Sequence, residues 1–428
     1  MFDFMNNPTV ALIVATVVKG ALLIVILLTA FAYMTLIERR VVAKIQGRLG
    51  PNRAGPMGLF QPVADALKMM FKEQMIPSQA RAGIYVLAPV ISVVVALCAF
   101  AVVPIGNNWS ANSGVHSIWD PFIGDINVGL LWILSISSLS VYGIVLGGWS
   151  SGNRYSLLGA LRSAAQMVSY ETSLGLALSG VLMWAGSLSM VTIVHRQLDM
   201  GIWYICAQPL GFVIYIIAAV AEVNRAPFDL PEAEQELTAG YLTEYAGLRW
   251  SLFQMAEYIN MITVSAVAST LFFGGWSLFG LTDGIPILSI VIFMIKVAFF
   301  LFLFIWLRAT LPRIRYDRLM RFGWQVLLPL AALNIVITAC TVALGGDRFW
   351  WISGVAGLLV VVVMLFAIRR QGILEGTHFS EVETGKPVLP HSVRLVTYEQ
   401  EPELEQDEDS APSVSQPPLA RNSNTVQV

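Results

Sequence analysis

Charged residues are scarce in this chain, and cysteines are few. Only 13% of the 428 residues are charged and 56% are hydrophobic, whereas about a quarter of a soluble domain is charged. Three scattered cysteines form no CxxC pair, and the four histidines are isolated. This excludes an iron–sulfur or zinc ligand set, and no phosphate-binding or dinucleotide motif is present. We therefore expect neither a metal nor a redox cofactor on this chain.

Long hydrophobic runs take the place of the missing charge. Because a membrane-crossing helix needs roughly 20 apolar residues, and helices satisfy their own backbone polar groups, the runs predict an all-α, polytopic membrane helix bundle over residues 1–370. Nine transmembrane helices are expected near 10–37, 83–104, 127–148, 158–187, 203–223, 251–274, 286–308, 324–344 and 349–368.

Lysine and arginine alternate between the predicted loops. Residues 38–82 hold eight of them and 308–323 hold five, whereas 105–126 and 275–285 hold none. Positively charged loops stay in the cytoplasm, which predicts an outside N-terminus and a cytoplasmic C-terminus. The unbroken alternation also supports the count of nine, since a missed span inverts every later loop.

The C-terminal segment has a different composition. Residues 371–428 carry ten acidic and three basic groups among Pro, Ser and Gln. Such a segment cannot bury a hydrophobic core, so it predicts a disordered, acidic cytoplasmic tail.

Residues 57–73 predict an amphipathic helix at the cytoplasmic membrane interface. Phe60, Leu67 and Phe71 share one apolar stripe, and Asp65 and Lys68 lie on the opposite side. A helix with this pattern lies flat in the interface instead of crossing it. The alternative is an ordinary packing helix.

Acidic side chains inside the predicted spans are costly and usually face protein or water. Glu171 lies near the middle of the fourth span, Glu222 ends the fifth, and Glu257 lies in the sixth. Paired structural charges are the alternative interpretation, which fits Glu171 poorly because it is too deep to reach a helix end.

The segment 221–245, AEVNRAPFDLPEAEQELTAGYLTEY, crowds acids between two spans. Its proline residues interrupt any helix, and Arg225 is its one cation. Carboxylates held close together near low dielectric cannot all ionise, so the pattern favours a proton relay over a solvated acidic loop. The acids are Glu222, Asp229, Glu232, Glu234, Glu236 and Glu244.

Several long motifs occur in order: ERR at 38–40, QGRLGPNRAGP at 46–56, GLFQPVADALKMMFKE at 58–73, SYE at 169–171, AEVNRAPFDLPEAEQEL at 221–237, AEYIN at 256–260 and LRATLPRIRYDRLM at 307–320. Together they resemble the H subunit of bacterial NADH–quinone oxidoreductase, respiratory complex I. The resemblance runs from about residue 10 to 345, and the tail looks like the extensions of actinobacterial members.

The resemblance implies a subunit that anchors the redox arm to the membrane arm and walls the quinone chamber. Residues matched to family positions near the quinone path are Glu38, Arg39, Arg48 and Asp65, and we expect the quinone to enter through an apolar opening beside Phe60, Leu67 and Phe71. Residues matched to the acidic chain that couples quinone reduction to proton translocation are Glu171, Glu222, Asp229, Glu232, Glu234, Glu236 and Glu244, and Glu257 also matches a family acid.

The implied substrate is a quinone, either menaquinone or ubiquinone, reduced by clusters on other subunits. The implied partners are the peripheral-arm quinone-site subunits, the antiporter-like membrane subunits and membrane lipid, with no nucleic acid. The implied location is the bacterial plasma (inner) membrane.

Three other functions remain open at this point. An energy-converting hydrogenase uses an equivalent membrane subunit without quinone, and genes for an NADH-oxidising module nearby would exclude it. A secondary ion transporter also has broken helices and intramembrane charge, and it would move ions as a lone chain in vesicles. A passive anchor leaves the mid-span acid Glu171 unexplained.

Overall fold

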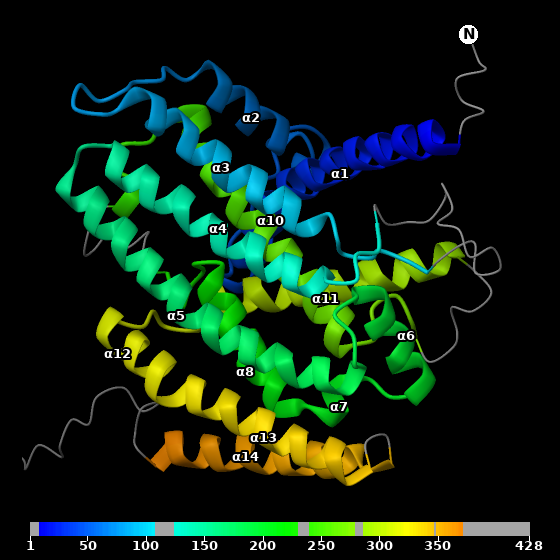
Figure 1. Cartoon of the computed structure of the whole chain (residues 1–428). Coiled ribbons are helices and arrows are strands. Elements are labelled where there is room, and N and C mark those ends of the chain that lie inside the picture. Colours follow the sequence, from blue (N-terminus) through cyan, green and yellow to red (C-terminus); the bar gives the residue numbers. More distant parts are fainter. Residues whose placement is uncertain (1–7, 108–123, 230–238, 279–285, 346–347, 371–428) are drawn as a thin grey trace, which may run out of the picture. The chain divides into compact units, whose positions relative to one another are not determined.

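The computed structural model describes residues 8–107, 124–229, 239–278, 286–345 and 348–370 (Figure 1), and within these ranges it contains helices and no strand. The all-α prediction is confirmed. The described residues up to Ala367 belong to one compact unit. The long helices are α1 (Pro8–Ile45), α3 (Ala82–Phe100), α4 (Gly129–Ser150), α5 (Arg154–Ala185), α10 (Gly247–Phe272), α11 (Pro286–Thr310), α13 (Leu328–Gly345) and α14 (Trp350–Arg370).

Each of the nine predicted spans contains helix in the structure. Six helices in the described ranges are long and apolar enough to cross a membrane, or seven if α5 and α6 (Met190–Met200), bent by 57°, form one span. The fifth predicted span is broken into α7 (Tyr204–Ala207) and the shorter apolar helix α8 (Pro209–Glu222). A multi-pass membrane protein follows, and the exact count of nine stays a prediction. The predicted tail lies outside the described residues.

The predicted amphipathic helix begins later than expected. Residues Pro56–Gly58 form the short 3-10 turn η2, in which Met57 has a φ of 53° and Gly58 a φ of 74°. These left-handed conformations are incompatible with an α-helix, so α2 covers only Gln61–Phe71. The boundary predicted at residue 57 is therefore wrong by four residues.

Helix α6 was missed in the loop expected at 188–202. Ser189 caps its N-terminus by accepting from the Thr192 backbone N–H at 3.2 Å, and Gly201 ends it in the left-handed conformation. Both are ordinary signals of a helix end. The helix was not predicted because its eleven residues are too few for a membrane span.

Helix α10 holds the centre of this unit. It packs against α1, α2, α3, α6 and α11, while α5 packs against α4, α8 and α13; α3, α4 and α5 run side by side in Figure 1. The 3-10 turn η3 (Gly240–Leu242) lies directly on α5, because Gly159 has no side chain: a Cβ there would come within 2.5 Å of the Gly240 Cα. This close approach brings the end of the acidic segment against α5.

Candidate functional site

An open cleft lies where the C-terminal half of α1 meets α10 and the end of α11. Among the predicted chamber residues, Glu38, Arg39 and Arg48 all line it. The structure therefore brings together three residues that the sequence could only place in one loop-and-helix region. The full lining comprises Glu38, Arg39, Val42, Gln46, Arg48, Pro51, Tyr258, Arg308 and Ala309.

Glu38 is held by two arginines. Its side chain is 7% exposed, and its Oε1 accepts from the Nη1 atoms of Arg308 and, at 3.4 Å, of Arg225. Arg308 is itself about a third exposed, with 36% of its side chain accessible, so it faces the cleft while Arg225 lies behind it. Opposite charges placed this close offset the cost of removing the carboxylate from water.

Arg225 is the buried centre of this charge cluster, although the sequence singled it out only as the one cation among acids. It is 6% exposed, and its guanidinium carbon lies 4.2 Å from the centre of the Tyr258 ring. Burial by itself disfavours the guanidinium charge, but interaction with Tyr258 and with the carboxylates of Glu38 and Glu257 outweighs it and raises the pKa of Arg225. Arg225 therefore remains a cation at every physiological pH.

The backbone around Arg225 is fixed from two sides. The side-chain Nε2 of Gln166 on α5 donates to the carbonyls of Ala221 and Phe228, both at 2.7 Å. From the other side, the backbone N–H of Ile314 donates to the Pro227 carbonyl at 3.1 Å. The described first part of the acidic segment is thus a packed turn, and not a solvated loop.

Glu257 connects this cluster to the second part of the acidic segment. Glu257 is 9% exposed, and its carboxylate interacts electrostatically with Arg225 and accepts from the Tyr241 hydroxyl at 3.0 Å. Tyr241 belongs to η3, which precedes Glu244 by a few residues. Hydrogen bonds and charge interactions therefore link Glu38 to Arg225, Arg225 to Glu257, and Glu257 to η3.

Glu244 is held by a residue that sequence reasoning missed. Its Oε1 accepts from the Nδ2 of Asn153 at 2.8 Å. Its backbone carbonyl accepts from the Tyr85 hydroxyl at 2.6 Å. Tyr85 stacks on Tyr245, with ring centres 4.2 Å apart, and burial raises the pKa of Tyr245 to about 12.

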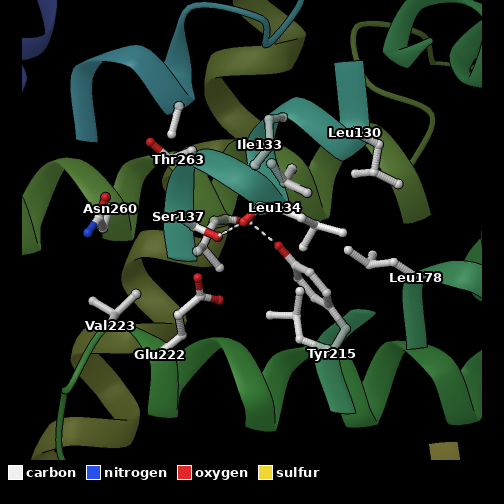
Figure 2. A pocket seen from close by; sticks show the side chains of 14 residues that line it. Leu130, Ile133, Leu134, Ser137, Leu178, Tyr215, Glu222, Val223, Asn260 and Thr263 are labelled. Carbon is white, nitrogen blue, oxygen red and sulfur yellow. Dashed lines mark hydrogen bonds between the residues drawn. The ribbon is translucent and has the colours of Figure 1, made fainter. Parts of the chain in front are cut away.

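A separate pocket lies between α3, α4, α5, α8 and α10, and Figure 2 shows the Glu222 carboxylate pointing into it toward Ser137. The Ser137 hydroxyl donates to the Leu134 carbonyl at 3.0 Å, and both Ser137 and the carboxylate of Glu171 interact electrostatically with Glu222. Tyr215 lines the same pocket and donates to the Val264 carbonyl at 2.9 Å. The pocket walls are otherwise mostly apolar, so the two acids interact through a region of low dielectric.

Helix α10 joins the cleft to this pocket. Tyr258 lines the cleft, and Asn260 and Thr263 line the pocket. Residues three or four apart lie on one helix face, so Glu257 stands one turn from Asn260. The two regions are thus adjacent along one buried helix.

The predicted amphipathic helix reaches the cleft through its polar side. Asp65 accepts from Arg39 at 2.7 Å, which places the middle of α2 beside α1. The apolar stripe does not line the cleft: Phe60 is 61%, Leu67 49% and Phe71 84% exposed in this chain. That exposure fits contact with lipid or with a partner subunit, and the assignment to a quinone opening stays a prediction.

Three predicted relay residues, Glu232, Glu234 and Glu236, lie outside the described residues. Asp229 is half-buried just before them. The site residues that sequence reasoning did not select are Arg225, Arg308, Tyr258, Tyr241 and Asn153. Tyr258 directly follows Glu257 in the AEYIN motif, and Tyr241 lies in the acidic segment three residues before Glu244; these positions were the one available signal. In the described ranges, no three His, Cys, Asp or Glu residues gather as a metal ligand set.

The chain is similar to known proteins over most of its length. A sequence model of the family described as NADH dehydrogenase matches residues 18–339. The NADH-quinone oxidoreductase H subunit of Deinococcus deserti is 48% identical over 88% of this chain and 96% of its own length. NADH-quinone oxidoreductase subunit 8 of Thermus thermophilus is 49% identical over 81% of this chain and 93% of its own. The corresponding H subunit of Protochlamydia amoebophila is 53% identical over 73% and 92%.

Proposed function

Because the chain belongs to the family of the NADH–quinone oxidoreductase H subunit and is a membrane subunit of complex I, we propose that its cleft walls the quinone chamber and that its buried charges couple quinone reduction to proton translocation. Other subunits of the complex supply the electrons. The resemblance inferred from the sequence is confirmed at the level of the family. The residue roles below are our proposal.

The observation that carries the proposal is the contact between Glu38 and two arginines of different exposure. Arg308 faces the cleft and Arg225 is buried behind the same carboxylate. A quinone head group takes up protons with its electrons, so reduction in the cleft changes the charge beside Glu38 and Arg308. Arg225 cannot lose its proton. Its guanidinium therefore responds by interacting more strongly with one of the two carboxylates, Glu38 or Glu257, and less strongly with the other.

In the second step, either a proton or the electrostatic effect of the changed charge passes along α10 to the pocket that contains Glu222. Glu257 lies one turn from the pocket residue Asn260, and Glu222 and Glu171 already repel each other there. Two carboxylates beside a mostly apolar pocket hold a proton that is easily exchanged. We propose that Glu171 passes this change toward the antiporter-like subunits, together with the acids at 232–236.

The apolar stripe of α2 supplies the entrance. Its exposed side chains, with Phe71 the most accessible, suit the isoprenoid tail of a quinone or the acyl chains around it. The ion pair between Arg39 and Asp65 then ties the entrance helix to the cleft. Either menaquinone or ubiquinone fits this chemistry. The alternation of Lys and Arg between loops supports a cytoplasmic location for the C-terminus.

Substitution of Glu222 by Gln in the assembled complex tests the coupling. We expect both quinone-linked NADH oxidation and proton pumping in vesicles to fall about tenfold or more, because the pocket loses its exchangeable proton. The matched control is Asp199→Asn, which neutralises an exposed acid of α6 outside the network. Parental rates of both oxidation and pumping in the Glu222→Gln enzyme contradict the relay, and Glu232→Gln or Glu234→Gln extends the test to the acids outside the described residues.

A further inference from the structure

At the N-terminus of α5, one side chain, Asn153, makes two hydrogen bonds that the proposed relay of acids does not by itself explain. Asn153 is the N-cap of α5, and its side-chain Oδ1 accepts from the Tyr155 backbone N–H at 3.0 Å. The other end of the same amide, Nδ2, donates to Glu244 Oε1 at 2.8 Å. One side chain therefore satisfies the helix end and a carboxylate at once.

The two contacts fix the orientation of the Asn153 amide. A backbone N–H can only donate, so the atom facing Tyr155 must be the oxygen. A carboxylate can only accept, so the atom facing Glu244 must be the nitrogen. Of the residues that cap helices well, only asparagine presents both an acceptor and an N–H donor in this way.

The backbone that carries Glu244 is held independently of Asn153. The Tyr85 hydroxyl of α3 donates to the Glu244 carbonyl at 2.6 Å, and the Tyr245 hydroxyl approaches Ser150 of α4 at 3.3 Å. The Gly159–Gly240 contact presses the same turn onto α5. With the backbone fixed, the Asn153 amide decides where the carboxylate itself points.

We propose that Asn153 is a positioning residue that holds the Glu244 carboxylate against the N-terminus of α5, the helix whose middle carries Glu171. This inference rests on the proposed role of Glu244 in the relay. Asn153 acts through Glu244 and handles no proton itself. Glu244 and Glu171 are thereby mounted on one rigid element, about 27 Å apart along its axis at 1.5 Å per residue.

Two substitutions separate the positioning contact from the helix cap. Asn153→Ser keeps a capping oxygen but removes the amide donor, and Asn153→Asp keeps the cap but places a carboxylate against Glu244. In the assembled complex we expect proton pumping to fall about threefold in the serine variant and about tenfold in the aspartate variant, because a charge-assisted hydrogen bond is lost or replaced by repulsion.

The decisive comparison repeats Asn153→Asp in a Glu244→Gln background, where an amide faces the new carboxylate and can donate to it. Heat resistance of the four assembled complexes is measured beside pumping, because it does not depend on residual turnover. We expect Asn153→Asp to lower heat resistance in the parent and to leave it unchanged in the Glu244→Gln background. An equal loss in both backgrounds overturns the inference, as does parental pumping in the aspartate variant. A Glu244→Gln enzyme that pumps at the parental rate instead refutes the relay role and leaves the contact testable by heat resistance.

Discussion

The substitution Glu38→Gln removes the charge that Arg225 and Arg308 share. At the observed 3.4 Å between Arg225 and Glu38, the attraction amounts to about 5 kcal/mol for an effective dielectric constant near 20. Breaking a buried ion pair costs about 3–5 kcal/mol because the remaining charge stays desolvated.

We expect the lower end of this range, about 3 kcal/mol, for two structural reasons. Arg308 is 36% exposed and regains water once Glu38 is neutral. Arg225 cannot do so, but it keeps the Tyr258 ring and the charge of Glu257. For a chain of this length, such a loss lowers the unfolding midpoint by about 3 °C.

The assay compares the heat resistance of the purified complex from the parent, Glu38→Gln, Arg225→Gln and the double variant. The double variant should be only slightly less stable than the less stable of the two single variants. In the double variant, neither Glu38 nor Arg225 is left as a buried charge without its partner. A Glu38→Gln midpoint equal to that of the parent refutes the buried-pair reasoning. So does a double variant whose loss equals the sum of the two single losses.

Two further outcomes follow from the structure. Phe71→Ser on the exposed stripe of α2 should leave assembly intact but lower turnover with a long-tailed quinone several-fold more than with a short-tailed analogue; equal effects on both substrates contradict the entrance. Tyr245→Phe should lower the free energy of unfolding by about 1 kcal/mol at pH 8, because the hydrogen bonds of the hydroxyl are lost. Burial raises the pKa of Tyr245 from its ordinary 10 to about 12, a shift worth about 2.7 kcal/mol. The difference from the parent should therefore stay constant below pH 10, shrink above pH 10 and change sign before pH 12; a constant difference across that window contradicts the assignment.

Much of the fold was predictable because hydrophobicity and charge act locally along a helix. Every predicted span contains helix, and the early start assigned to α2 failed only where Met57 and Gly58 adopt left-handed conformations. Helix α6 escaped prediction because its eleven residues are too short and too polar to register as a membrane span.

The candidate site was predictable in part. Acids in apolar surroundings are recognisable by the cost of burying them, which is why Glu222 and Glu257 could be chosen in advance, whereas Glu38 was chosen through the family resemblance. Their partners could not be, because a satisfied arginine, tyrosine or asparagine has no distinctive sequence pattern.

The sequence by itself determined that this chain is an all-helical membrane protein of the complex I family named above, with acids inside its helical domain. Those properties depend on composition, order and motifs, which are independent of packing. Only the tertiary structure decided that Glu38 meets Arg308, 270 positions away, and that Asn153 meets Glu244, 91 positions away. Helix packing sets such distances, and removal from water then makes each of these charges depend on the neighbour it meets.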